Sequence, residues 1–319
     1  MILVCGSLAD PVTELVCARL QSCGYAYRFV ELGRYPEDYQ LGWCWRENRS
    51  EGWIAGPDWR LDLDEISGVY VRFLGPEDRP LLPGFDACDA AALRNEGDLA
   101  LIALIETLAC PVVNRMQGGV SNNSKPYQAL MIGRTGLRVP PTLVTSDPMA
   151  VRAFHEKHGE LIYKSASAVR SIVRRLGPDQ LERLELLRNG PAHLQAFIPG
   201  HNIRVHTVGE RIFATRIDSD AVDYRYAHLD GTTATLEPVT IQPAVEAACL
   251  RLADELGLLF AGIDLKQAPD GDYFCFEANP CPGFLYYERH TGQPISAALA
   301  DLLRGSAARS RHEAAAAMS

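Results

Sequence analysis

Residues 260–284 constrain the fold and the chemistry of this chain more than any other segment. They read FAGIDLKQAPDGDYFCFEANPCPGF. Residues 262–267 and 273–279 alternate between apolar and polar side chains, which is typical of strands buried on one face. Between them, residues 269–272 have the composition of a tight turn, because Gly271 tolerates the positive φ that such a turn needs. The segment is therefore predicted to form a β-hairpin.

A turn centred on residues 270–271 places Asp264 directly opposite Glu277. Because side chains alternate across a strand, Glu277 and Asn279 share one face, and Asp264 joins them at about 5 Å from Glu277. Two unpaired carboxylates at that distance repel by about 3 kcal/mol at an effective dielectric constant of ~20. Such a set of hard oxygen ligands, together with phosphate oxygens, suits Mg²⁺. The alternative is a structural hairpin whose acidic residues face water. The opposite face is predicted to be buried by four apolar residues, Ile263, Leu265, Phe274 and Phe276.

The composition is that of an ordinary globular protein, and 319 residues allow two or three domains. Hydrophobic residues make up 47% of the chain and charged residues 22%. The net charge of −9 argues against nucleic acid as the main partner, because an acidic field repels a polyanion. No apolar run approaches the ~20 residues of a membrane span, and the chain opens into a strand without a basic leader. We therefore expect a cytoplasmic protein with no membrane or nucleic-acid partner.

Nine cysteines are scattered along the chain without a C-x-x-C pair. Their odd number argues against a disulfide framework. Cys281 follows the hairpin and is the candidate for a reactive thiol. A thiol nucleophile needs a nearby base, and the sequence identifies none. Whether any cysteine reacts is left open.

The first 115 residues read as one α/β domain built on a Rossmann-like unit. A strand at 2–5, an amphipathic helix at 12–23 and a strand at 27–32 imply parallel strands with a right-handed crossover, although a G-x-G-x-x-G fingerprint is absent. Arg72 ends a later strand pattern and is either a site residue at the carboxyl edge of the sheet or a surface arginine. All four tryptophans lie within residues 43–59, where they form either a binding surface or ordinary packing.

Two lysines follow, each next to a distinctive local pattern. Lys125 ends an N-x-x-K motif, and residues 136–142 read GLRVPPT. A strand pattern at 161–164 ends in Lys164 and leads into residues 165–171, which are mainly Ser and Ala. Small residues allow backbone N–H groups to approach phosphate oxygens. Residues 165–171 are therefore compatible with the close approach of a phosphate, although neither lysine is remarkable by itself.

The hairpin residues Asp264, Glu277-Ala278-Asn279-Pro280 and Gly283 resemble the metal-binding hairpin of the ATP-grasp ligases. The N-x-x-K and G-L-x-V-P-x-T motifs are similar to the entry of the nucleotide domain in one branch, which contains ribosomal-protein glutamate ligases and microviridin-type (graspetide) macrocyclases. The resemblance implies an α/β fold with an N-terminal Rossmann-like domain and a two-lobed nucleotide domain. The implied divisions are residues 1–115 (N-terminal domain), 116–194 (central lobe), 195–305 (C-terminal lobe) and 306–319 (flexible tail).

The resemblance also implies a role for each matching residue. Mg²⁺, or Mn²⁺ in its place, would be held by Asp264, Glu277 and Asn279. Transfer of the γ-phosphate would be assisted by three catalytic residues whose cations stabilise phosphate oxygens, namely Lys164, Arg204 and Arg225. ATP would contact a larger set, which consists of Lys125, Lys164, Ser165, Ser167, Arg170, Gln195, Phe197, Ile198 and Arg204. Many ATP-grasp enzymes have glycines where this chain has Ser and Ala, and Arg170 is expected to compensate as a phosphate ligand.

The implied reaction is the activation of a carboxylate by ATP as an acyl phosphate, followed by attack of an amine from an amino acid or a peptide. ADP and phosphate would be released. Two alternatives remain open, a graspetide-type macrocyclase that forms side-chain esters or amides and a non-catalytic nucleotide-binding protein. The substrate would be a small amino acid or a peptide, and a homodimer is left open.

Overall fold

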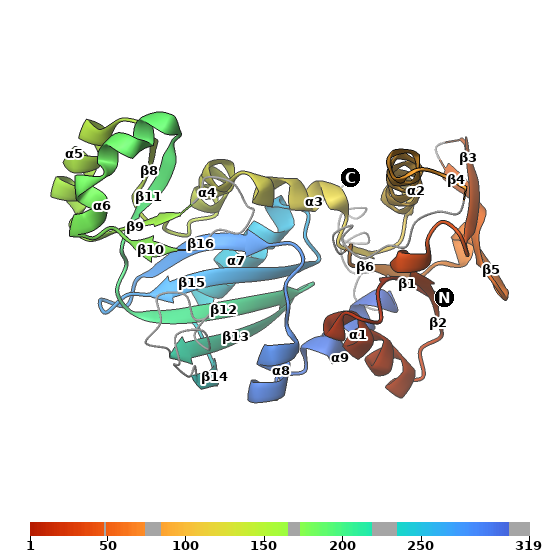
Figure 1. Ribbon diagram of the computed structural model, residues 1–319. Coiled ribbons are helices and arrows are strands. Elements are labelled where there is room, and N and C mark those ends of the chain that lie inside the picture. The colour runs from red at the N-terminus through yellow and green to blue at the C-terminus, as the bar shows by residue number, and fades with distance from the viewer. Residues whose placement is uncertain (48, 74–83, 165–172, 219–234, 306–319) are drawn as a thin grey trace.

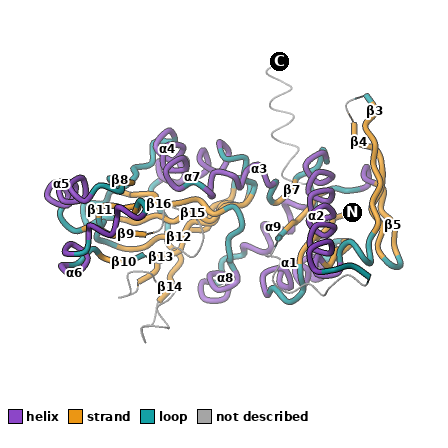
Figure 2. The backbone as a smooth tube through the Cα atoms, turned by 45° about the horizontal axis from the view of Figure 1, so that its top comes forward, coloured by secondary structure: helices purple, strands orange, loops and turns teal. Residues whose placement is uncertain are grey.

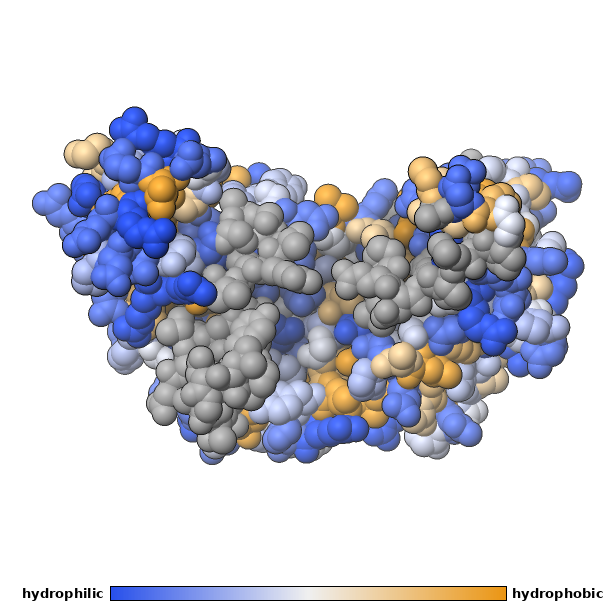
Figure 3. Space-filling model, viewed as in Figure 1, coloured by the Kyte–Doolittle hydropathy of each residue, from blue (hydrophilic) through white to orange (hydrophobic). Residues whose placement is uncertain are grey.

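The computed structural model describes residues 1–47, 49–73, 84–164, 173–218 and 235–305, and the description below concerns these residues (Figure 1). They form four β-sheets with helices packed on them. The N-terminal part lies at one end of the molecule, the largest sheet lies in the middle, and a small sheet lies at the other end (Figures 1 and 2). In the space-filling view the outline is hollowed to a saddle between the two ends (Figure 3).

The N-terminal sheet is entirely parallel. Its strands, in spatial order, are β2 (Tyr27–Glu31), β1 (Ile2–Gly6), β6 (Gly68–Val71) and β7 (Val112–Val113). Helix α2 (Ala87–Thr107) packs on one face, where Leu3 and Cys5 point. Helices α1 (Pro11–Ser22) and α9 (Ile295–Leu303) pack on the other face, where Ile2 and Val4 point. Helices on both faces explain why β1 is apolar throughout, as strands of a covered parallel sheet are.

The four tryptophans lie in a separate antiparallel sheet at the edge of the N-terminal part. It consists of β3 (Gln40–Arg46), β4 (Arg49–Gly56) and β5 (Trp59–Asp62). Ile54 and Leu61 anchor this sheet in the core that α2 covers, whereas Trp45 is 67% exposed. Packing against this core therefore explains some of the tryptophans, but it does not explain the exposed Trp45.

Two helices connect the N-terminal part to the rest of the chain, namely α3 (Met116–Gly119) and α4 (Lys125–Arg134). The small sheet that follows is antiparallel. It contains β10 (Arg174–Arg175), β9 (Leu161–Lys164), β11 (Ala192–Ala196) and β8 (Thr142–Thr145). Helices α5 (Pro148–His158) and α6 (Pro178–Glu182) cover one face of it, with Val151, Leu161, Leu184 and Leu194 as the buried core.

The largest sheet is a five-stranded antiparallel sheet that carries the predicted hairpin. Its strands, in spatial order, are β14 (Thr235–Val239), β13 (Arg211–Asp218), β12 (His201–Val208), β15 (Phe260–Gln267) and β16 (Tyr273–Asn279). Helix α7 (Pro243–Glu255) packs with α4 on one face, and helix α8 (Leu285–Thr291) follows the hairpin. The other face therefore carries the side chains that alternate away from this core.

The hairpin pairs Asp264 with Glu277, as the sequence predicts, but it contains a β-bulge. Near the turn Gln267 pairs with Tyr273, and the register shifts by one residue between Asp264 and Leu265. The shift adds one residue to β16 and brings the two carboxylates opposite each other. β-Bulges of this kind redirect side chains and are frequent next to functional sites.

The predicted burial of Phe274 and Phe276 is wrong, since both are only partly buried. Cys275 and Ala278 point into the α7 core instead and are 0% exposed. The turn is centred on Asp270 and not between Asp270 and Gly271. Between the turn and the bulge, the side chains of β16 therefore point to the opposite faces from those predicted. Ile263 and Leu265 face the core as predicted.

The end of the described chain returns to the N-terminal sheet. Helix α9 packs against α1, and Gly68 in β6 makes room for it, because a Cβ at Gly68 would lie 2.1 Å from the carbonyl oxygen of Leu303. Among the described residues no helix is long and apolar enough to span a membrane.

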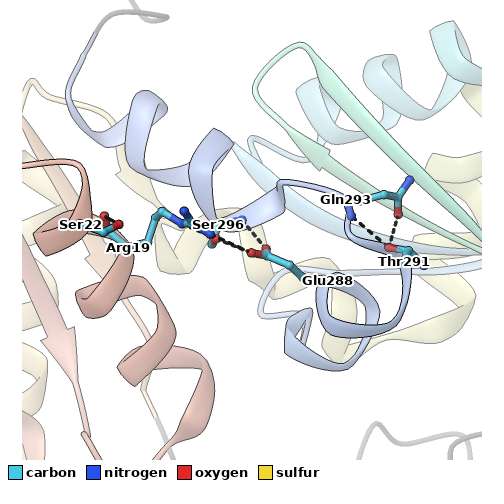
Figure 4. A network of polar contacts seen from close by, with 6 residues as sticks. All are labelled: Arg19, Ser22, Glu288, Thr291, Gln293 and Ser296. Atoms are coloured by element: carbon cyan, nitrogen blue, oxygen red, sulfur yellow. Dashed lines mark hydrogen bonds and ion pairs between the residues drawn. The ribbon is translucent and has the colours of Figure 1, made fainter.

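A polar network also joins α1 to α8 and α9 (Figure 4). Arg19 Nε donates to Ser296 Oγ at 2.9 Å, and Ser296 donates through both its backbone N–H and its Oγ to Glu288. Gln293 then ties the same segment to the large sheet, because its Oε1 accepts a hydrogen bond from Thr215 at 2.9 Å.

Candidate active site

The three predicted metal ligands lie on the face of the large sheet that is turned away from α7. Asp264, Glu277 and Asn279 are all partly buried, and Asp264 is paired in register with Glu277. Two carboxylates and one amide form a hard oxygen donor set, which fits Mg²⁺. Asn279 Oδ1 accepts a hydrogen bond from Cys281 N at 2.9 Å, and an amide oxygen has a second lone pair for a cation. The donor chemistry of the site therefore fits the ion.

Arg204 compensates the charge of Asp264. The two residues are paired in register between β12 and β15, and Arg204 Nη1 lies 2.7 Å from Asp264 Oδ1. The two side chains are only 7% and 22% exposed. The repulsion predicted for two unpaired carboxylates is therefore reduced, because an arginine neutralises Asp264. Arg204 is thus placed beside the metal ligands rather than at a distance from them.

Gly262 provides the space that the Arg204 side chain occupies. A Cβ at Gly262 would lie 2.1 Å from Arg204 Nη2 and 2.6 Å from Pro282 Cβ. Arg204 Nε also donates to His206 Nε2 at 3.4 Å. Burial, and then the charge of Arg204, hold the pKa of His206 well below its ordinary value, so the imidazole stays neutral and can accept that hydrogen bond.

Two buried amides that sequence reasoning missed fix the backbone of the hairpin. Gln128 in α4 is 2% exposed; its Nε2 donates to Ala278 O at 2.9 Å, and its Oε1 accepts from Ala278 N at 3.0 Å. Ala278 lies between the predicted ligands Glu277 and Asn279, so Gln128 fixes the backbone that carries both. The only signal in the sequence was the location of Gln128 three residues after Lys125.

Asn114 makes a similar clamp at the open end of the hairpin, beyond the strand positions that Gln128 holds. Its Nδ2 donates to the carbonyl oxygens of Phe260 and Pro280, both at 2.5 Å, and its Oδ1 accepts from Phe260 N at 3.1 Å. One side chain therefore joins the start of β15 to the residue that follows β16. The backbone of the hairpin is therefore held by one side chain that follows the N-terminal sheet and by one in the first turn of α4.

Arg72 reaches this site from the carboxyl edge of the N-terminal sheet. Its Nη1 donates to the carbonyl oxygen of Cys281 at 3.2 Å, and its Nε lies 2.9 Å from Asp10 Oδ2. Its side chain is only 13% exposed, so Arg72 is not a surface arginine. Desolvation raises the pKa of the Cys281 thiol, although the charge of the neighbouring Arg72 acts in the opposite direction. The raised pKa disfavours the thiolate.

The predicted nucleotide residues gather around the small sheet. Lys164 ends β9 and is paired in register with His193 of β11, while Lys125 begins α4. Burial, and then the charges of Lys164 and Lys125, lower the pKa of His193 to about 4. Both lysines are therefore close to one buried histidine, although they are far apart in the sequence. His193 is a further residue that the sequence motifs did not identify.

Gln195 and Phe197 lie where β11 passes toward the large sheet. Gln195 is 4% exposed, and its Nε2 donates to Thr142 Oγ1 at 3.0 Å. The ring of Phe197 lies 5.2 Å from Lys266 Nζ of β15, so it connects the two sheets. Ile198 follows directly and is partly buried. Ser165, Ser167, Arg170 and Arg225 lie outside the described residues, and their assigned roles stay predictions.

Comparison with known proteins supports the family resemblance. A family model described as a RimK-like ATP-grasp domain matches residues 133–303. Beta-citrylglutamate synthase B of Danio rerio is 23% identical over 224 residues, which cover 66% of this chain and 55% of that protein. Alpha-aminoadipate–LysW ligase LysX of Sulfurisphaera tokodaii is 23% identical over 193 residues, which cover 57% of this chain and 67% of that protein. The chain thus spans between half and two thirds of these curated relatives.

Two solved structures are similar over nearly the whole chain. The macrocyclase MdnC of Microcystis aeruginosa MRC, bound with precursor peptide MdnA, has a TM-score of 0.78 and 25% identity, and the match covers 96% of this chain and 100% of MdnC. The ATP-grasp ligase PsnB, complexed with a variant of its minimal precursor, Mg and ADP, has a TM-score of 0.78 and 27% identity, and the match covers 95% of this chain and 97% of PsnB. The predicted α/β ATP-grasp fold is confirmed. Because the family model spans more than half of the residues, the chain belongs to the RimK-like ATP-grasp family.

Proposed function

We propose that this protein is an ATP-dependent ligase that activates a carboxylate as an acyl phosphate and joins it to an amine of an amino acid or a peptide. The observation that carries the proposal is the ligand set of Asp264, Glu277 and Asn279, held on one sheet face beside Arg204. A protein that only binds nucleotide has no need of three oxygen-bearing side chains arranged to hold a cation. Membership of the family adds support.

The chain's own residues would divide the work between two sheets. Lys125 and Lys164 bind and orient the phosphates from the side of the small sheet. Arg204 holds Asp264 in place, and its positive charge stabilises the phosphate being transferred. Gln128 keeps Glu277 and Asn279 at a constant separation through the backbone of Ala278. Mg²⁺, when bound, would neutralise the charge that develops on the transferred phosphate.

No protein nucleophile is required for this reaction. The substrate carboxylate oxygen attacks the terminal phosphorus of ATP, and ADP leaves. The amine then attacks the acyl carbon, and phosphate leaves. The raised pKa of Cys281 is consistent with a mechanism in which no thiolate takes part.

A graspetide-type macrocyclase is the second candidate. The observation that favours it is coverage, since MdnC and PsnB match over 95% or more of both chains, whereas the two curated ligases match over 55% and 67% of their lengths. In such an enzyme the carboxylate and the acceptor hydroxyl or amine belong to the same peptide, and one water is lost for each bond formed.

One experiment separates these candidates. The protein is incubated with ATP, Mg²⁺ and either mixtures of amino acids or peptides that carry acidic, hydroxyl and lysine side chains, and the products are analysed by mass spectrometry and nucleotide chromatography. ADP with a joined product supports the ligase, and ADP with a peptide that has lost water supports the macrocyclase. Formation of AMP and pyrophosphate would contradict the acyl-phosphate route.

A further inference from the structure

Arg72 connects the N-terminal sheet to the loop that follows the predicted metal ligands. It comes directly after β6, and its backbone N–H donates to Cys5 O of β1 at 2.9 Å, so its backbone is fixed at the carboxyl edge of the sheet. Its Nη1 donates to Cys281 O at 3.2 Å and to Cys281 Sγ at 2.9 Å. One side chain therefore bridges two parts of the molecule that are 209 residues apart in the sequence.

Cys281 in turn fixes the orientation of a predicted metal ligand, because its backbone N–H donates to Asn279 Oδ1 at 2.9 Å. Groups that hydrogen-bond to a metal ligand determine how the ligand is oriented, and their loss typically costs about 10- to 100-fold in metal affinity. Asn114 holds the preceding residue through Pro280 O, so the loop keeps one attachment when Arg72 is removed. We therefore expect Arg72 to act on Asn279 through Cys281, with an effect at the low end of that range.

Arg72 is itself anchored by Asp10. Arg72 Nε lies 2.9 Å from Asp10 Oδ2, and the two side chains are 13% and 10% exposed. The contact is an ion pair, because Nε has no hydrogen-bond partner among the described residues. The same Oδ2 accepts hydrogen bonds from Thr13 N at 2.8 Å and from Thr13 Oγ1 at 2.9 Å, and so caps helix α1. The guanidinium is therefore held between the start of α1 and the loop at Cys281.

There is an alternative role for an arginine at this edge of the sheet, which is to bind the substrate carboxylate. Two observations argue against it. Asp10 balances the positive charge of Arg72, so the pair attracts a second carboxylate much less than a single cation would. Nη1, which would form half of a bidentate contact, is directed at Cys281. The contacts therefore favour a role in positioning over a role in substrate binding.

We propose that Arg72 is a positioning residue for the metal site, which holds Cys281 so that the Cys281 N–H keeps the Asn279 side chain in the orientation seen in the structure. This inference rests on the proposed ATP-dependent function, and it makes a residue of the N-terminal sheet part of that function. The sign of the effect separates positioning from charge. Removing a positive charge near a cation site strengthens cation binding, whereas losing a positioning contact weakens it.

The test measures the binding of Mn²⁺ to the full chain in the presence of ADP. Mn²⁺ has the same preference for oxygen ligands as Mg²⁺, and the free ion is counted by electron paramagnetic resonance. Arg72→Met should bind Mn²⁺ about tenfold more weakly than the wild type. Arg72→Lys keeps the charge but not the planar fork of donors, so it should also bind Mn²⁺ more weakly than the wild type. Binding of ADP without a divalent metal should be unchanged in both variants.

Arg19→Met is the matched control, because it makes the same replacement at an arginine that also joins the N-terminal part to the end of the chain (Figure 4). Arg19 contacts Ser296 and Glu288 and not the loop at Cys281. Its replacement should lower the thermal midpoint but leave Mn²⁺ binding as in the wild type. Asp10→Asn keeps a capping side chain for α1 and removes the ion pair of Arg72, so it should weaken Mn²⁺ binding less than Arg72→Met does. It decides the question if neither Arg72 variant folds.

Each other outcome overturns the inference in a different way. Unchanged or tighter Mn²⁺ binding in a folded Arg72 variant, or in Asp10→Asn where that variant decides, shows that Arg72 does not position the metal site, and the ligase function stands. Equal weakening in Arg19→Met shows a general loosening of α1. A raised KM for the carboxylate substrate with unchanged Mn²⁺ binding shows that Arg72 contacts substrate. If the wild-type protein binds no Mn²⁺ with ADP, the inference and the proposed function fall together.

Discussion

The polar groups predicted to form the site are bonded differently on the two sheets, although His206 Nδ1 and Thr207 Oγ1 of the large sheet also have no partner among the described residues. On the large sheet, Asp264 is bonded to Arg204, and the backbone between Glu277 and Asn279 is bonded to Gln128. On the small sheet, His193 and Gln195 are just as buried, yet three of their polar atoms have no partner among the described residues. The comparison teaches that, among the described residues, Asp264 and the hairpin backbone are bonded to other side chains, whereas these polar atoms of the small sheet are not.

The buried apolar core is larger behind the hairpin than behind the small sheet. The hairpin is backed by α4 and α7 with a continuous apolar core, while the small sheet rests on four buried residues under α5 and α6. Elements with few buried contacts open at lower free energy and are the ones that move during catalysis. We therefore expect the small-sheet lobe to gain order when nucleotide binds and the hairpin to remain as it is.

The largest effect is a loss of turnover, expected when a negative charge is removed from the predicted metal ligands on the large sheet. Glu277→Gln keeps the shape of the side chain but weakens the donor set for the cation. Because a bound metal supplies several kcal/mol at the transition state, turnover should fall on the order of 10²-fold or more. Turnover is measured as ADP release at saturating Mg²⁺, and thermal unfolding should show an intact fold. Near wild-type turnover would show that the hairpin is structural.

The next effect concerns the clamp on the hairpin. Gln128→Met removes both hydrogen bonds to Ala278 and leaves a buried N–H and a buried carbonyl oxygen without partners. The unfolding free energy should fall by roughly 2–6 kcal/mol, since two groups lose their partners and each unsatisfied group costs about 1–3 kcal/mol. Gln21→Met, at an exposed position of α1, is the control and should change stability by about 0.5 kcal/mol at most. Urea unfolding of the two variants measures the difference, and equal midpoints would mean that Gln128 does not fix the hairpin.

A smaller effect is expected from filling the space under Arg204. Gly262→Ala places a Cβ against the guanidinium, so Arg204 or Pro282 must shift, and such overpacking costs about 1–3 kcal/mol of unfolding free energy. Gly283→Ala is the matched control, because a Cβ there meets nothing within 4 Å. If both variants have the same stability and the same turnover, the close packing of Arg204 on β15 has no consequence.

The smallest effect is a change in pH dependence. The pKa of His206 is lowered by burial, so below about pH 6.5 the unfolded chain binds a proton there that the native chain does not. The unfolding free energy therefore falls as the pH falls, with this residue contributing at most ~1.4 kcal/mol per pH unit. His206→Phe should give a flatter profile between pH 7 and pH 5, measured by urea unfolding. Parallel profiles would contradict the assignment.

The sequence predicted the parts of the site that depend on local patterns. The pairing of Asp264 with Glu277 was predictable because period-two alternation and a glycine turn define a hairpin from within one segment. Lys164 was found because it ends a strand. The bulge in β16 was not predictable in this way, since a register shift depends on the partner strand and on the core behind it. Its consequence was the wrong assignment of Phe274 and Phe276 to the core.

The residues that were missed act across long sequence separations. Gln128 and Asn114 bond to backbone groups about 150 residues further along the chain, and no local pattern announces such contacts. His193 was unremarkable in the sequence because its significance lies in what surrounds it. Arg72 was recognised as a candidate, but only the structure connects it to Cys281 and Asp10.

The packing of α9 against α1 has a consequence for how this protein is made. Val12, Val16 and Leu20 of α1 are sealed by Leu299 and Leu303, which the ribosome adds almost three hundred residues later. The face of the first sheet that carries α1 therefore stays incomplete for most of translation, at a time when N-terminal domains usually fold. A growing chain should expose this apolar surface until its last helix emerges, and a chaperone that binds such surfaces would find its target here.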